Sequence, residues 1–189
     1  MEPLAQILGS PARLKLLRLF MFNQDTAFSI ENIVTRTKIS RETVRSELAD
    51  LSAAGLLRKK GTHLNARYQT NPRFEYREIF DTFIRETTVL SPKHIVASLR
   101  KAGTLRLVIL TGLFTGILEP QVDLLVVGDH LNERTLAGVV HSLEADLGRE
   151  IRYAFFATAD FRYRLGVYDR LLRDVFDYPH RLLVDKIGL

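Results

Sequence analysis

The sequence predicts an α+β protein with two halves: a helical N-terminal half that ends in a β-hairpin, and a smaller α/β half. In the first half, apolar residues recur at the three- and four-residue spacing of an amphipathic helix. In the second half, short apolar runs of strand length alternate with helical segments. A chain of 189 residues can form two small domains. We place these domains at 1–72 and 104–189, with a helical connector at 73–103.

Three short helices are predicted within the first 55 residues, ending near residues 22, 37 and 54. Each begins after a serine, whose side chain can accept a hydrogen bond from the first turn: Ser10, Ser29 and Ser40. A tight turn at Lys38 and Ile39 separates the second helix from the third. Gly55 follows the third helix as a stop signal.

Two helices joined by so short a turn form a helix-turn-helix. Its last helix would be the recognition helix, whose N-terminal residues point at base edges in the major groove. Four residues are therefore candidate base contacts: Arg41, Thr43, Arg45 and Ser46. An arginine can bond both acceptors of a guanine edge, which is worth roughly 1–3 kcal/mol of discrimination. Alternatively, Arg41 and Arg45 pair with Glu42 or Glu47 on a solvated helix face.

A basic β-hairpin is predicted directly after the recognition helix. Its strands fall within 56–61 and 67–70, on either side of a tip at 62–66 that contains Asn65. The hairpin carries four cations: Arg58, Lys59, Lys60 and Arg67. A basic hairpin in this position is the wing of a winged helix, and its expected task is contact with phosphates or the minor groove.

Positive charge is concentrated in the same region. The chain has 27 Lys and Arg against 22 Asp and Glu, a formal charge of +5. The segment 26–72 has 8 basic and 4 acidic side chains, so it accounts for most of the excess. A localised basic surface indicates a polyanionic partner, and we expect double-stranded DNA. The alternative is a solvated basic face without a partner.

Residues 5–72 resemble the winged-helix transcriptional regulators of the ArsR/MarR type. The runs 8–17 (LGSPARLKLL) and 51–57 (LSAAGLL) carry most of the likeness. The resemblance implies that the third helix and the hairpin bind DNA. Sensors of the ArsR type usually detect metals through cysteines, and this chain has none, so we do not expect metal sensing.

A further helix is predicted at 74–86, with a wide apolar stripe. The stripe contains Tyr76, Ile79, Phe80, Phe83 and Ile84. It packs either against its own chain or against the same helix of a second subunit. Regulators of this type usually dimerise, because a two-fold protein matches a palindromic site. We therefore expect a homodimer.

The second half contains four predicted strands and four predicted helices. Strands are expected at 105–110, 122–127, 151–157 and 181–185, and helices at 91–101, 132–147, 159–166 and 168–176. A glycine-bearing connection, 111–116, joins the first two strands, and Gly148 ends the longest helix.

This half resembles the minimal nucleotidyltransferases of the DNA polymerase β superfamily. The likeness is carried by strand 105–110, Gly112, the run 122–129 (VDLLVVGD) and the run 147–151 (LGREI). A winged helix fused to such a domain matches a known bacterial and archaeal arrangement. The resemblance implies a Gly-Ser pair, two carboxylates one residue apart and a third on a neighbouring strand. Together the carboxylates hold two divalent metals.

The sequence departs from that pattern at most of its positions. Leu113 replaces the serine after Gly112, Gln121 replaces the first carboxylate, Asp123 remains, and Arg152 falls near the third carboxylate. One carboxylate and a neutral amide do not supply the ligands that such hard cations need. We therefore expect a catalytically inactive domain, without metal or cofactor, that serves for dimerisation or effector sensing. Residual nucleotide binding around Gly112 stays open.

Two other functions remain open at this point. The protein could be an active nucleotidyltransferase, if Glu119 or Glu150 replaces the missing ligands. It could also be an antitoxin-like partner of a separate protein. The sequence has neither a signal-peptide pattern nor an apolar run long enough to span a membrane, so we expect a cytoplasmic protein.

Overall fold

The computed structural model describes residues 2–62, 65–117 and 119–189, and the chain has a mixed α+β fold. It divides into two compact units. Unit 1 contains Met1–Leu90 and His141–Glu150, and unit 2 contains Ser91–Val140 and Ile151–Leu189. The division thus differs from the predicted boundaries, because it splits the 73–103 connector and brings a distant segment into unit 1. Among the described helices, none has the length and apolar character needed to cross a bilayer.

Among its described residues, unit 1 contains five helices before residue 90, together with the end of a sixth. These five are α1 (Pro3–Ile7), α2 (Pro11–Phe22), α3 (Ile30–Thr37), α4 (Arg41–Ala53) and α5 (Arg77–Thr87). The three predicted serine caps are confirmed: Ser10, Ser29 and Ser40 accept hydrogen bonds from the amides of Arg13, Asn32 and Thr43. The helix predicted at 74–86 begins only at Arg77.

A three-stranded antiparallel sheet completes unit 1. Its strands are β1 (Phe28–Ser29), β2 (Leu57–Lys60) and β3 (Arg67–Thr70), in the order β1-β3-β2. Strands β2 and β3 form the predicted hairpin, and residues 63 and 64 of its predicted tip lie outside the described residues. Strand β1 was not predicted, because two residues carry no detectable periodicity.

The core of unit 1 lies between the helices and this sheet. Phe20, Ile33, Val44 and Leu48 are fully buried, one or more from each of the three central helices. Helix α5 adds Ile84 to the same core. Each such side chain contributes about 1.5–3 kcal/mol by leaving water, so this packing fixes the orientation of α4 within the unit.

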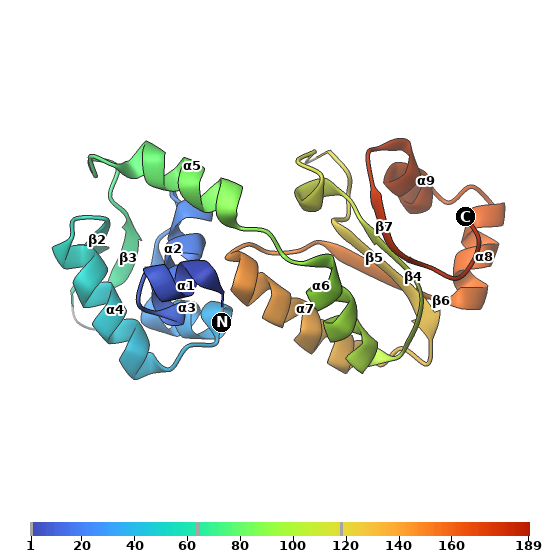
Figure 1. Cartoon of the computed structure of the whole chain (residues 1–189), viewed down its shortest axis with the longest axis horizontal. Helices are drawn as coiled ribbons and strands as arrows, with labels where there is room; N and C mark the ends of the chain where they lie inside the picture. Colours follow the sequence, from blue (N-terminus) through green and yellow to red (C-terminus); the bar gives the residue numbers. More distant parts are fainter. Residues whose placement is uncertain (1, 63–64, 118) are drawn as a thin grey trace. The chain divides into compact units, whose positions relative to one another are not determined.

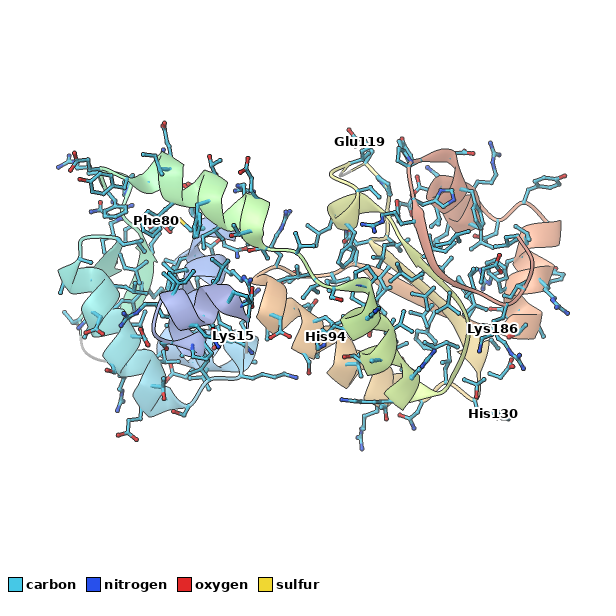
Figure 2. All side chains as sticks on the ribbon, viewed as in Figure 1. Lys15, Phe80, His94, Glu119, His130 and Lys186 are labelled. Atoms are coloured by element: carbon cyan, nitrogen blue, oxygen red, sulfur yellow. The ribbon has the colours of Figure 1, made fainter. Side chains whose placement is uncertain are left out.

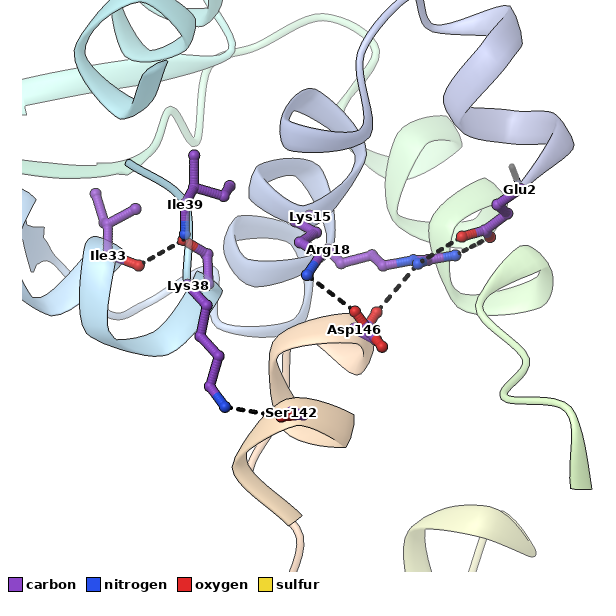
Figure 3. Close-up of polar contacts among 9 residues, drawn as sticks. Glu2, Lys15, Arg18, Ile33, Lys38, Ile39, Ser142 and Asp146 are labelled. Carbon is purple, nitrogen blue, oxygen red and sulfur yellow. Dashed lines mark hydrogen bonds and ion pairs between the residues drawn. The ribbon is translucent and has the colours of Figure 1, made fainter. Parts of the chain in front are cut away.

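Polar contacts attach the segment His141–Glu150 to the rest of unit 1 (Figure 3). Lys15 forms an ion pair with Asp146 at 3.0 Å, and the buried Arg18 donates to the Asp146 carbonyl at 3.0 Å. Arg18 also bonds Glu2. Three further bonds join the segment to this unit: Lys38 to Ser142, Asn23 to Gly148 and Arg36 to Glu150.

Unit 2 is built around a four-stranded sheet in the order β6-β5-β4-β7. Its elements are α6 (Pro92–Leu99), η1 (Arg100–Ala102), β4 (Thr104–Leu110), η2 (Gly112–Phe114), β5 (Leu124–Asp129), the first part of α7 (Glu133–Leu147), β6 (Tyr153–Ala157), α8 (Thr158–Gly166), α9 (Arg170–Asp177) and β7 (Arg181–Asp185). Figure 1 shows α6 and the start of α7 on one face of this sheet, and α8 and α9 on the other.

The sheet of unit 2 is mixed, a feature that the predicted alternation of strands and helices did not specify. Strands β5 and β6 are parallel, whereas β4 is antiparallel to both β5 and β7. An antiparallel pair needs no crossover helix, and only the short η2 lies between β4 and β5. Consequently, the ends of β5, β6 and β7 and the start of β4 all lie at one end of the sheet.

Candidate functional site

The four predicted base-contacting residues lie together on the exposed side of α4. Arg41, Thr43, Arg45 and Ser46 are exposed, while Val44 and Leu48 of the same helix are buried. Thr43 is also close to the helix cap, since its hydroxyl lies 2.8 Å from that of Ser40. The start of α4 therefore presents two guanidinium groups and two hydroxyls to solvent.

Arg41 forms an ion pair with Glu31, in the first turn of α3. A backbone hydrogen bond of Glu31 and the charge of Arg41 both hold the pKa of this carboxyl below its ordinary value. The pairing proposed from the sequence, with Glu42 or Glu47, is not the one observed. Arg45 makes no ion pair with any residue that the structure describes.

Glu47 has a structural task instead. Its carboxylate accepts a hydrogen bond from Arg13 Nε at 2.8 Å, and Asp50 accepts one from Arg13 Nη2 at 2.8 Å. Arg13 lies on α2, so these two bonds attach α4 to α2. The sequence did not reveal either Arg13 or Glu31 as a partner, because both contacts depend on how separate helices pack.

The hairpin presents its cations on two faces. Cross-strand partners share a face, so the register places Lys60 beside Arg67 and Arg58 beside Gln69. Lys59 lies opposite Tyr68, on the face that packs against the core. Lys59, Lys60 and Arg67 are exposed at the end of the hairpin. Arg58 is half-buried and donates to Gln69 Oε1 at 3.2 Å, so it is less available to a ligand.

Asp123 is the centre of a second polar site, in unit 2. Its side chain is 3% exposed and forms an ion pair with Arg152, whose Nη2 lies 2.8 Å from Oδ1 and whose Nε lies 3.0 Å from Oδ2. The Leu113 amide donates to Oδ1 at 2.8 Å, and the Arg152 amide donates to Oδ2 at 2.9 Å. Each carboxylate oxygen thus accepts two hydrogen bonds, which uses its lone pairs.

These contacts determine the charge state of Asp123. Burial raises the pKa of this carboxyl, but the hydrogen bonds from the Arg152 side chain and from the two amides outweigh burial, and the pKa lies below its ordinary value. The same hydrogen bond raises the pKa of Arg152. The site therefore holds a permanent ion pair at neutral pH.

The other residues predicted to form a nucleotidyltransferase-like site with Asp123 divide into two groups. Gly112 and Leu113 contact Asp123: Gly112 has a φ of 51°, and a Cβ at this position would collide with the Asp123 carboxylate. Gln121 is exposed in the loop before β5, where its backbone N–H donates to Asp174 Oδ2 at 2.6 Å. The predicted strand began at 122, whereas β5 begins at Leu124, so both Gln121 and Asp123 precede the strand.

The two carboxylates considered as substitute metal ligands lie elsewhere. Glu150 belongs to unit 1, where it pairs with Arg36 at 2.6 Å. Glu119 is exposed in the loop that leads to β5 (Figure 2). Within the described ranges, no group of three or more His, Asp or Glu side chains is arranged to hold a metal ion.

Comparison with known proteins returns no matching family model, no matching curated protein and no matching solved structure.

Proposed function

We propose that this protein is a DNA-binding transcriptional regulator that acts as a homodimer. Unit 1 would be a winged helix-turn-helix of the ArsR/MarR type, and unit 2 an inactive nucleotidyltransferase-like domain used for dimerisation or effector sensing. One observation carries the proposal. The first turns of α4 present Arg41, Thr43, Arg45 and Ser46 to solvent, in the same unit as an exposed basic hairpin.

In this proposal α4 reads bases and the hairpin binds phosphates. Arg45 has no competing carboxylate among the described residues, so its fork is free to bond a guanine edge. Arg41 would exchange Glu31 for DNA, which costs part of the affinity that it contributes. Lys59, Lys60 and Arg67 would neutralise phosphates and release counterions, a sequence-independent and salt-sensitive contribution.

Helix α5 supports the dimer. Ile79 (68%) and Phe83 (40%) of this helix remain exposed four residues apart, and Tyr76 (50%), directly before its first residue, is exposed as well. The neighbouring side of the helix contributes Ile84 and Phe80 to the core of unit 1. A helix that buries one side in its own core and exposes apolar side chains beside it is typical of an interface.

The Asp123 site supports the absence of transferase activity. A carboxylate whose four acceptor positions are occupied by donors offers nothing to Mg²⁺, and the Arg152 guanidinium beside it repels a cation. We expect no transfer of label when the protein is incubated with labelled ATP, Mg²⁺ and Mn²⁺. Transfer that is lost in Asp123→Asn would contradict this part of the proposal.

The test of DNA binding is selection of genomic fragments at low salt and again at about 0.2 M salt. We expect one palindromic site to be enriched at the higher salt, with a half-site spacing that reflects the dimer. Binding that disappears at the higher salt and shows no preferred site would mean that the basic hairpin binds polyanions without specificity.

Variants distinguish the two kinds of contact. Arg45→Ala and Arg41→Ala should lower the preference for the selected site, by about 1–3 kcal/mol for a lost guanine contact. Lys59→Ala should weaken binding to all DNA alike and reduce the salt slope by about one. The matched control is Lys93→Ala, an exposed lysine of unit 2, which should change neither. Equal losses on selected and random DNA in all three test variants would contradict the assigned roles.

A further inference from the structure

A cationic hollow of about 300 Å³ lies at the end of the unit 2 sheet opposite to Asp123. It is lined by Arg106, Asp129, Thr158, Arg162, Lys186 and Ile187. We propose that this hollow binds the phosphate group of a small molecule. The site is independent of the DNA-binding role proposed for unit 1, because all of its residues belong to unit 2.

The topology of the sheet brings these residues together. Arg106 is near the start of β4, and Asp129 is the last residue of β5. Thr158 follows β6 directly, and Lys186 follows β7 directly. Because β4 is antiparallel to its neighbours, one end of the sheet collects a contribution from all four strands. Figure 2 shows Lys186 towards this end, where His130 follows β5.

A β-bulge aims Arg106 at the hollow. The β4–β5 register shifts between Leu105 and Leu107, so Arg106 is the additional residue of the bulge. Gly128 lies opposite Leu105, where a Cβ would collide with the Thr104 carbonyl oxygen. Bulges of this kind redirect a side chain and are frequent beside functional sites.

Asp129 fixes the Arg106 guanidinium without using all of its donors. Arg106 Nε donates to Asp129 Oδ2 at 2.7 Å, and the Thr158 hydroxyl donates to Asp129 Oδ1 at 2.6 Å. These two bonds also hold the pKa of Asp129 below its ordinary value, with Thr158 the larger cause. The two Nη groups of Arg106 make no hydrogen bond within the described part of the chain, so both have donors to offer an incoming anion.

Two further cations border the hollow without a counter-ion. Arg162 and Lys186 are exposed, and neither forms an ion pair with a described residue. Arg164 on the same helix differs, since it pairs with both Asp160 and Asp169. The hollow thus combines three cations with one carboxylate, and the positive end of α8 begins at Thr158.

The chemistry of this lining selects phosphate. Two guanidinium groups and an ammonium can give several charge-assisted hydrogen bonds to one tetrahedral dianion. A volume of about 300 Å³ is at the lower end of small-molecule pockets and fits a phosphorylated small molecule. Lys186 also lines a second hollow of about 260 Å³ with Arg100, which provides a place for another anionic group.

The experiment is calorimetric titration of the full chain with inorganic phosphate and with pyrophosphate, at constant ionic strength. We expect saturable binding, tighter for pyrophosphate. Arg162→Ala and Lys186→Ala should each weaken it about tenfold or more, as expected for the loss of one charge-assisted hydrogen bond. The control is Arg134→Ala with Arg170→Ala, two exposed arginines of unit 2 outside the hollow, which should leave binding unchanged. Circular dichroism establishes that each variant is folded.

Three results would overturn the proposal. The first is no saturable heat with either anion in the millimolar range. The second is an equal loss of binding in the control, which would make the effect one of general charge. The third is displacement of pyrophosphate by a short DNA duplex with the same dependence on Arg162 and Lys186, which would assign the surface to nucleic acid. None of these three results changes the outcome expected from the selection of genomic fragments. The phosphate-binding proposal and the DNA-binding proposal can therefore fail separately.

Discussion

At the scale of single residues, Asp123 combines burial with full ionisation. A buried carboxylate is normally expensive, yet four donors on Arg152 and the amides of Leu113 and Arg152 compensate for lost water. Removing its charge therefore leaves buried donors without an ionic acceptor. The residue that resembles a catalytic ligand in the sequence acts as a structural anchor between β4 and β6.

Asp123→Asn should lower the free energy of unfolding by about 1–3 kcal/mol at pH 7. The folded-state pKa of Asp123 lies below its ordinary value of 3.8, so its contribution is present above pH 3.8 and is lost as the pH falls through the folded-state value. The difference between wild type and variant in urea unfolding should therefore shrink below about pH 4.

Asp177→Asn is the matched control for that measurement. This aspartate is exposed and makes no ion pair with a described residue, so the change should stay within about 0.5 kcal/mol. A difference for Asp123→Asn that persists unchanged to pH 2.5 would contradict the role of the ionised carboxylate.

The sequence identified Asp123 and Arg152 as members of one site, but not the bonds between them. Their contact follows from the parallel pairing of β5 with β6, which sets Leu124 beside Tyr153. The same holds for Arg41, whose partner Glu31 belongs to another helix. The local sequence pattern locates charged residues, whereas the partner with which each one forms an ion pair depends on how the elements pack.

At the scale of elements, the serine caps make a prediction about α4. Ser40→Ala removes the acceptor of the Thr43 amide and should lower the free energy of unfolding by about 1 kcal/mol. Ser46→Ala on the same helix should change stability by less than about 0.5 kcal/mol, because Ser46 is exposed and bonds no described residue.

The same pair separates stability from recognition. If α4 reads bases, Ser46→Ala should alter the preference for particular DNA sites and leave the thermal unfolding midpoint unchanged. If Ser46→Ala lowered the free energy of unfolding as much as Ser40→Ala, the stabilising effect assigned to the Ser40 hydrogen bond would be contradicted.

The exposed stripe of α5 makes a second prediction at this scale. Ile79→Glu should convert a dimer into a monomer, because a carboxylate in an apolar interface loses its hydration. Sedimentation equilibrium measures the change. Ile7→Glu, the same substitution at an equally exposed site of α1, should leave the dimer intact. A wild-type monomer at all concentrations would contradict the homodimer.

Most predicted helices and strands overlap an observed element, whereas α1 was not predicted at all. The caps and apolar periodicity located α2, α3 and α4, because both signals are local. Strand β1 is too short to have a period, and α5 starts late because Phe74 and Tyr76 belong to the turns before it. Strand direction in unit 2 was also missed, since an apolar run has the same pattern in either orientation.

At the scale of the whole molecule, a substitution at Gly148 tests whether the packing of the segment His141–Glu150 stabilises unit 1. Its φ is 74°, and a Cβ there would lie 2.5 Å from the backbone carbonyl carbon of Arg18. Gly148→Ala should therefore lower the free energy of unfolding by about 2–4 kcal/mol, from the backbone conformation and the collision together.

Gly138→Ala, inside the helix α7 that ends just before Gly148, should have the opposite effect on stability. A Cβ at Gly138 meets no atom within 4 Å, and α7 is helical there, so this variant should be more stable by about 0.4–1 kcal/mol. Chemical unfolding of the two variants beside wild type measures both. Equal effects of the two substitutions would contradict the close approach to Arg18.

Sequence order alone did not indicate the division of the molecule. The predicted boundary at 103–104 places all of 132–147 in the second domain, whereas residues 141–150 belong to unit 1. The bonds responsible join residues more than 100 positions apart, such as Asn23 with Gly148 and Lys38 with Ser142. Neither partner stands out in the sequence, because exposed polar side chains are common on any helix.

This division has a consequence for the order in which the protein is made. A ribosome that has released the first 90 residues has not yet produced the acceptors for Lys15, Arg18 and Asn23, which lie at 146 and 148. Domains usually fold from the N-terminus as the chain emerges. Here the hydrophobic core of the first unit lies within the first 90 residues, but these three contacts cannot form until residue 148 has left the tunnel, by which time β4 and β5 are already available to pair. Unit 1, which contains the start of the chain, is therefore completed only after the segment 141–150 has been translated.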